Sequence, residues 1–227
     1  MFATRGITAG LALASIVTLA GCGSATKTET SPTSAAASTS ASASATPNKT
    51  IKDYLAANQI VQTPVQPGEP GTPVITLPAL PGWSDLTTEQ TTEAGGIPPY
   101  AAKGYDAATD PNSRPVIQLR LAKLVGDADF EQLLQLAPAD SQNTPGFAFK
   151  AKPGATTLSG YDGVAFSGIV PQNGQNWVTA SRFIVIPDAD PSTTYLVRLN
   201  GTAPESYEGP LMDALSLVDT SAMIESG

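Results

Sequence analysis

Cys22 is the only cysteine in this chain of 227 residues. No disulfide can therefore form within the chain, and thiolate metal clusters are excluded because they need several cysteines. The chain also contains no histidine, which removes the usual general base at neutral pH, the Ser-His-Asp and Cys-His arrangements, and most zinc sites. Any folded part must be held together by packing alone.

The residues around Cys22 have the pattern of a bacterial lipoprotein signal. Arg5 gives a positive start, residues 6–18 are apolar, and Leu19-Ala20-Gly21 lies directly before the cysteine. The apolar stretch is too short for a comfortable transmembrane helix. We expect cleavage after residue 21 and lipidation of the Cys22 thiol. A secretory signal with an incidental cysteine is the alternative.

Two or three acyl chains on Cys22 would anchor the protein stably, since each buried CH₂ contributes about 0.8 kcal/mol. The expected location is the outer face of the plasma membrane, in the cell envelope. Residues 23–49 are almost all Ser, Thr, Ala and Pro and cannot form a core, so we expect a disordered tether. It would keep the domain about 30 Å from the membrane, at roughly 5–6 Å × √n.

The expected organisation is a signal peptide over 1–21, the lipidated Cys22 with its tether over 22–49, one domain over 50–222, and a tail over 223–227. The formal charge is -8, from 12 basic and 20 acidic residues. An acidic surface argues against nucleic acid as a partner. It also argues against electrostatic docking on anionic headgroups, so membrane attachment would depend on the lipid anchor.

Alternating apolar and polar residues predict several short strands. These are residues 74–77, 100–107, 116–125, 147–151, 164–170, 177–186 and 195–199. Asn173-Gly174 is typical of a hairpin turn between two of them. Helices are few and flank the strands, which predicts an α+β fold with one twisted, mostly antiparallel sheet covered by helices.

Three segments have helical signals. Thr50 and Asp53 resemble a capping box. Residues 127–137 combine acids in the first turn with an apolar stripe made of Phe130, Leu133, Leu134 and Ala137. Pro204 opens a last helix with an apolar face that comprises Tyr207, Leu211, Leu215 and Val218.

Four segments, taken in order, resemble the LpqN/LpqT family of mycobacterial lipoproteins. They are IKDYLAANQIVQTPVQPGEPGTPVITLPALPGW, DFEQLLQLAPADSQNTPGF, LSGYDGVAFSGIVPQNGQNW and YLVRLNGTAPESYEGPLMDALSLVD. The resemblance covers essentially all of residues 50–222. It implies a PsbP-like fold and a non-catalytic envelope protein associated with cell-wall lipids and glycolipids. It brings no catalytic motif that can be carried over residue by residue.

Catalytic side chains are scarce in the predicted domain. Asp127, Asp129 and Glu131 could supply a glycosidase pair, but helix capping and the helix dipole already explain acids at this position. Asp162 fits a turn. No lysine of the domain lies in an S-x-x-K pattern; the lysines are Lys52, Lys103, Lys123, Lys150 and Lys152. We therefore expect no enzyme, no cofactor and no metal site.

Arginines and aromatic residues are the candidates for ligand binding. Arg120, Arg182 and Arg198 lie in predicted strands on the less apolar face. A hairpin around residues 187–192 would make Arg182 and Arg198 cross-strand neighbours, which need an acid between them or bind an anionic ligand group. A solvated or internally paired face is the alternative. Five aromatic residues could line an apolar or sugar-stacking groove, with core packing as the alternative: Trp83, Tyr100, Tyr105, Tyr161 and Trp177.

These observations favour an envelope lipoprotein that binds or chaperones a lipid or glycolipid, as an accessory to a membrane lipid exporter. The alternative is a protein–protein adaptor in the envelope or towards a host protein, and a hydrolase is the third hypothesis. An apolar pocket would favour the first hypothesis, and a flat exposed apolar patch the second. A hydrolase would need paired buried carboxylates in a cleft.

Overall fold

The computed structural model describes residues 46–91, 98–172 and 174–227. The predicted signal, Cys22 and nearly all of the tether lie outside the described residues, as does Asn173 of the predicted hairpin turn. Within the described part of the chain, no helix has both the length and the apolar character needed to cross a membrane.

The main sheet is antiparallel throughout, with the strand order β3-β4-β5-β9-β8-β7-β6, and β1 also pairs with β5. Its strands are β1 (Val61–Val65), β3 (Trp83–Asp85), β4 (Ala101–Tyr105), β5 (Val116–Val125), β6 (Ala148–Leu158), β7 (Tyr161–Gln172), β8 (Gln175–Pro187) and β9 (Thr193–Pro204). A second, two-stranded sheet joins β2 (Val74–Thr76) to β10 (Met223–Glu225). The predicted α+β class and mostly antiparallel sheet are confirmed.

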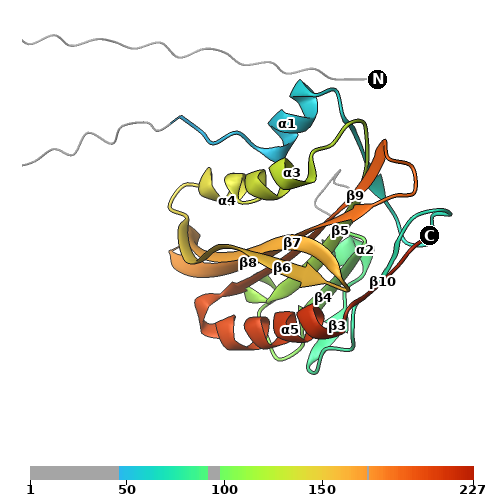
Figure 1. The fold of residues 1–227 in the computed structure, drawn as a ribbon. Coiled ribbons are helices and arrows are strands. Elements are labelled where there is room, and N and C mark those ends of the chain that lie inside the picture. Colours follow the sequence, from blue (N-terminus) through green and yellow to red (C-terminus); the bar gives the residue numbers. More distant parts are fainter. Residues whose placement is uncertain (1–45, 92–97, 173) are drawn as a thin grey trace, which may run out of the picture. The chain divides into compact units, whose positions relative to one another are not determined.

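Helices cover both faces of the main sheet (Figure 1). They are α1 (Ile51–Ala57), α2 (Thr88–Thr91), α3 (Phe130–Leu136), α4 (Ala139–Gln142) and α5 (Glu208–Ser221), with single 3₁₀ turns at Pro111–Ser113 and Glu205–Tyr207. The long helix α5 packs on one face, and α1, α3 and α4 lie on the other. We call these the α5 face and the α3/α4 face.

Successive side chains along β8 point to opposite faces of the sheet, as the strand period of two requires. Ile184 and Ile186 pack in the core under α5, whereas Phe183 and Val185 pack in the core with α1 and α3. The sheet is therefore apolar on both sides over its middle, and two separate cores hold the helices in place.

The capping box predicted at the start of the domain is present. The Asp53 backbone N–H donates to Thr50 Oγ1 at 3.2 Å, and the Thr50 backbone N–H donates to Asp53 Oδ2 at 2.9 Å. These bonds satisfy two backbone donors that the first helical turn would otherwise leave open. Just before them, Asn143 beside α4 exchanges two hydrogen bonds with the backbone of Asn48, at 2.7 and 2.8 Å. Asn48, which the sequence assigned to the tether, is thus held by the domain.

Three predicted details differ from the structure. The tail over 223–227 is partly wrong, because Met223–Glu225 form β10, which pairs with β2. The stripe of α3 excludes Phe130, the first helical residue, which is 40% exposed and is not part of the core that contains Leu133 and Ala137. The last α-helix begins at Glu208, after a 3₁₀ turn, rather than at Pro204.

Candidate functional site

The α3/α4 face changes from apolar to polar along β8 and β9. Phe183 lies opposite Arg198, Ser181 opposite Asn200, and Thr179 opposite Thr202. Towards the β7–β8 turn this face bears hydroxyl, amide and guanidinium groups in place of core side chains. A polar surface beside α4 is the result.

A hollow of about 400 Å³ lies over this polar surface. Its walls come from α4 and the segment after it, and from β7, β8 and β9: Asp140, Ser141, Thr144, Val170, Gln172, Trp177, Val178, Thr179, Arg198, Asn200 and Thr202. Polar groups and apolar surface contribute about equally. Such a lining suits a polar molecule with an apolar side better than a bare alkyl chain.

Trp177 lines this hollow with a half-buried side chain that carries an unsatisfied donor. Its indole Nε1 is buried and has no hydrogen-bond partner among the described residues. A buried donor without a partner costs about 1–3 kcal/mol.

The hydroxyl and amide groups of the hollow are already oriented. Ser181 Oγ and Thr179 Oγ1 both donate to Asn200 Oδ1, at 2.8 and 3.3 Å. Because the Asn200 carbonyl oxygen takes both hydroxyl protons, its amide nitrogen is the group that can donate to a ligand. The arrangement is a preformed donor and acceptor surface.

A smaller hollow adjoins the first one, and a third adjoins the second. The second, of about 220 Å³, shares Asp140 and Arg198 with the first and adds Arg120 and Lys52. The third, of about 170 Å³, shares Arg120 and Gln62 with the second. We refer to the three hollows together as the sheet groove. It crosses the α3/α4 face from Trp177 to Arg120.

Arg198 is the charged residue at the centre of the sheet groove. Its Nη1 lies 3.9 Å from Asp140 Oδ2, and its guanidinium lies 5.3 Å from the centre of the Phe183 ring. Burial lowers the pKa of Arg198 from its ordinary value, Asp140 opposes this shift, and the positive charge of Arg120 adds to it. A guanidinium nevertheless stays charged at physiological pH.

Arg182 and Arg198 lie on opposite faces of the sheet, so their predicted cross-strand pairing is wrong. The register places Leu199 opposite Arg182 and Phe183 opposite Arg198. A shift of one residue exchanges the faces of a strand. Arg182 is buried on the α5 face, where it makes two hydrogen bonds to Asp219, at 3.0 and 2.8 Å. It therefore acts in packing α5.

The five predicted aromatic residues do not line one common groove. Trp177 lines the largest hollow of the sheet groove and Tyr100 the smallest. Tyr100 also belongs to the core of the α5 face, together with Trp83, and Tyr105 and Tyr161 pack against that core. The rings of Trp83 and Tyr105 lie 5.4 Å apart and border a separate hollow of about 250 Å³ beside α5.

Several groove residues were missed by sequence reasoning. Asp140, Ser141 and Thr144 come from α4 and the residues after it, which have no pattern that distinguishes them from a loop. Thr179 and Asn200 did carry a signal, since they alternate with buried residues in strands that are otherwise apolar.

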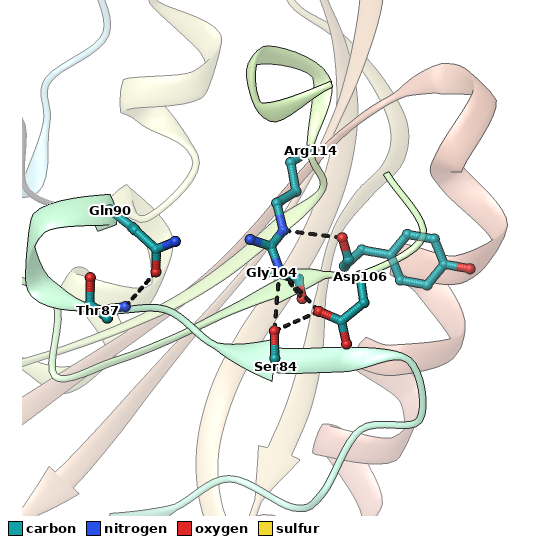
Figure 2. A network of polar contacts seen from close by, with 7 residues as sticks. Ser84, Thr87, Gln90, Gly104, Asp106 and Arg114 are labelled. Carbon is teal, nitrogen blue, oxygen red and sulfur yellow. Dashed lines mark hydrogen bonds and ion pairs between the residues drawn. The ribbon is translucent and has the colours of Figure 1, made fainter. Parts of the chain in front are cut away.

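A polar network around Arg114 is the other dense cluster of side-chain hydrogen bonds (Figure 2). Arg114 donates to the backbone oxygens of Tyr105 and Gly104 at 3.1 and 3.2 Å, and to Ser84 and Asp106 at 3.2 and 3.0 Å. Ser84 Oγ also donates to Asp106. The network ties β3 and β4 to the 3₁₀ turn, and its role is structural.

Two of the three predicted acids at the start of α3 have structural partners. Asp129 caps α3 by accepting from the Gln132 backbone N–H at 3.0 Å, and Glu131 accepts from Gln135 at 3.1 Å. Over the part of the chain that the structure describes, no three acidic, histidine or cysteine residues are grouped closely enough to hold a metal ion.

Known proteins are similar to this chain in sequence and in fold. A family described as "Probable lipoprotein LpqN" matches residues 47–225. Lipoprotein LpqN of Mycobacterium tuberculosis is 35% identical over 178 residues, which are 78% of this chain and 75% of that protein. The crystal structure of LpqN "involved in cell envelope biogenesis of Mycobacterium tuberculosis" has a TM-score of 0.71 and 34% identity, covering 79% of this chain and 99% of that one. The crystallised relative thus consists almost entirely of the matched domain. This chain belongs to the LpqN lipoprotein family.

Proposed function

We propose that this protein is an envelope lipoprotein, anchored through Cys22 on the outer face of the plasma membrane, that binds the headgroup of an envelope lipid or glycolipid in the sheet groove. The solved relative is described as involved in cell envelope biogenesis, and lipids and glycolipids are the material of an envelope. The observation that carries the proposal is the 400 Å³ hollow, in which Trp177 lies beside the polar side chains of Thr179 and Asn200.

The lining of the hollow favours a headgroup over an acyl chain. Hydroxyl and amide groups such as those of Thr179 and Asn200 can exchange hydrogen bonds with the hydroxyls of a sugar. The Trp177 ring, with its cross-strand neighbour Val170, supplies apolar surface for a sugar face or for the first carbons of a chain. The chains themselves could then remain in the membrane or in a partner.

A role as an accessory to a membrane lipid exporter fits this arrangement. A domain tethered roughly 30 Å from the membrane can reach a lipid headgroup at an exporter and release it again. An open groove suits such transient contact, because an enclosed cavity would have to open before each exchange.

Tryptophan fluorescence gives a direct test, since the chain has only two tryptophans. We expect the Trp83→Phe variant of residues 46–227, in which Trp177 is the reporter, to change its emission saturably with an alkyl glycoside such as dodecyl maltoside. The matched Trp177→Phe variant, which reports from Trp83 on the other face, should show no change. Equal responses, or none in either variant, would count against the groove.

Native mass spectrometry after incubation with an envelope lipid extract would identify the ligand. A retained lipid or glycolipid in the wild-type domain, lost in the Trp177→Ala variant, is the expected result. A bare protein under conditions in which a known lipid carrier keeps its cargo would contradict the proposal.

The adaptor hypothesis keeps one specific observation. Val61 and Val125 lie opposite each other on β1 and β5 and are 61% and 42% exposed. This apolar pair at the outer strand β1 could contact another protein. Cross-linking in cells from position 61 would capture such a partner, and a Val61→Ser variant should lose it without losing ligand binding in the groove.

A further inference from the structure

Arg120 and Arg198 are direct cross-strand neighbours on β5 and β9. Side chains in such positions start about 5 Å apart, and like charges directly opposite each other are unfavourable. The pair lies on the α3/α4 face, where both residues line the 220 Å³ hollow of the sheet groove. The fold therefore places two guanidinium groups at the edge of one open space.

The lining of this hollow contains more basic than acidic residues, although the protein as a whole is acidic. Its lining includes three cations, Lys52, Arg120 and Arg198, against one acid, Asp140. The whole chain has only 12 basic residues against 20 acidic ones. A local excess of positive charge in such a chain does not follow from its composition.

The contact between Arg198 and Asp140 is loose compared with the other ion pairs of the described residues. Their charged atoms are 3.9 Å apart. The pairs Lys103–Asp85, Arg114–Asp106 and Arg182–Asp219 are at 2.6, 3.0 and 2.8 Å. Asp140 is 53% exposed and lies on α4, a single turn of helix. The guanidinium of Arg198 therefore has donors that this acid does not use.

We infer that the hollow between Arg120 and Arg198 is a subsite for a phosphate-type oxyanion, so that the headgroup bound in the sheet groove is an anionic one. Guanidinium groups donate two parallel hydrogen bonds to such an oxyanion, and a pair of them can share its charge. The inference rests on the proposed function, because it names the class of headgroup for the same groove.

The size of the hollow agrees with this occupant. Liquid water takes about 30 Å³ per molecule, so 220 Å³ leaves room for a phosphate group and the first carbons esterified to it. The adjoining 400 Å³ hollow is then available for the remainder of the headgroup. The shared chemistry is an oxyanion, which either a lipid headgroup or free phosphate could provide.

Calorimetric titration of residues 46–227 at low salt tests the subsite with three probes: hexyl phosphate, the neutral hexyl glucoside, and inorganic phosphate. We expect hexyl phosphate to bind more tightly than hexyl glucoside. The Arg198→Gln substitution should weaken the binding of hexyl phosphate by about tenfold or more, as expected for a lost charge-assisted hydrogen bond. Binding of hexyl glucoside should stay within about twofold of the wild type, a shift of only about 0.4 kcal/mol.

Two further variants sharpen the result. Asp140→Asn removes the competing acid and should increase the affinity for hexyl phosphate by about threefold to fivefold. Damage to the fold would not produce such an increase. Lys152→Gln makes the same charge change as Arg198→Gln at an exposed position on β6 outside the groove lining, and should leave all three affinities unchanged.

The outcomes separate this inference from the proposed function. If the wild type binds hexyl glucoside but not hexyl phosphate, or if Arg198→Gln weakens both equally, the oxyanion subsite is refuted and the groove proposal stands. If neither amphiphile binds, both are refuted. Binding of inorganic phosphate with the same dependence on Arg198 would support the subsite with free phosphate as a sufficient ligand. Binding of hexyl phosphate alone would support a lipid headgroup.

Discussion

Removing the acid from the buried pair between Arg182 and Asp219 should destabilise the domain strongly. Arg182 is only 7% exposed, and its two hydrogen bonds to Asp219 join β8 to the last turn of α5. In the Asp219→Asn variant the guanidinium would remain buried without a counter-charge. Such an unpaired buried charge is far more costly than the loss of an exposed ion pair.

The expected loss can be estimated from the geometry. Breaking a fully buried pair costs about 3–5 kcal/mol, but the Asp219 side chain is 29% exposed, so water can partly solvate the remaining charge. Asp219 also lies near the carboxyl end of α5, where a negative charge is unfavourable by about 0.3–1 kcal/mol, and its removal relieves that cost. We therefore expect a net loss of about 2–3 kcal/mol, a large part of the 5–15 kcal/mol typical of a domain.

Arg182→Met is the matched control. It removes the cation but keeps an apolar side chain of similar length, so no charge is left buried on β8, and the loss should be about 1 kcal/mol or less. Urea unfolding measures the stability of both variants, and with an unchanged m value the shift in the urea midpoint gives the change in the free energy of unfolding. If Asp219→Asn cost less than about 1 kcal/mol, or no more than Arg182→Met, the reasoning from an unpaired buried charge would be refuted.

Three more predictions test the local structure. Gly104→Ala should lower the free energy of unfolding by about 1–3 kcal/mol, because the added Cβ would lie 2.5 Å from Arg114 Nε. Gly154→Ala, whose Cβ would have nothing within 4 Å, should be nearly neutral in thermal unfolding. Equal melting points of the two variants would contradict this. Hydrogen bonds from Thr50 hold the pKa of Asp53 below its ordinary value of 3.8, so their stabilisation is complete above that pH and lost as the pH falls below it. The Thr50→Ala variant should therefore melt at a lower temperature than wild type at pH 6, and this difference in melting temperature should narrow in acid. Burial raises the pKa of Tyr195 above its ordinary value of 10.0, so the stability of the domain should fall as the pH rises above 10. Tyr195→Phe loses the hydrogen bond to Gly71 O. In urea unfolding it should cost about 1 kcal/mol at pH 7 and less at pH 11.

The parts of the fold that were predictable from sequence have local causes. The strand predicted over 116–125 has the bounds that β5 has in the structure, because alternating side chains that are buried on one face leave a period of two in the sequence. The capping box of Thr50 and Asp53 is likewise a matter of residues three apart. Such signals need no knowledge of the rest of the molecule.

The missed strands depend on distant partners. β1 is exposed at four of its five positions and contains Pro64, so it has almost no alternation, yet it pairs with residues 121–125 of β5. β10 is only three residues long and forms against β2, about 150 residues earlier in the chain. Pairing of this kind is decided by tertiary structure and leaves no local pattern.

The site was only partly predictable for a related reason. Arg198 and Trp177 were identified from residue type, but the face on which Arg198 lies is set by the register of β8 and β9. That register depends on the turn at residues 188–192, where a change of one residue would have placed Arg182 and Arg198 together. Asp140, which faces Arg198, is brought there by the packing of α4.

The sheet groove exists because the helices on its face are too short to cover the strands. β8 and β9 have 13 and 12 residues, which is roughly 40 Å at about 3.3 Å per residue. On the α5 face a helix of 14 residues covers roughly 21 Å at 1.5 Å per residue, and the core beneath it is closed. On the other face lie three separate short helices, α1 and α3 with seven residues each and α4 with four, or roughly 10, 10 and 6 Å. The uncovered end of the strands carries polar side chains such as those of Thr179, Asn200 and Thr202, and these form the surface that we propose as the headgroup site.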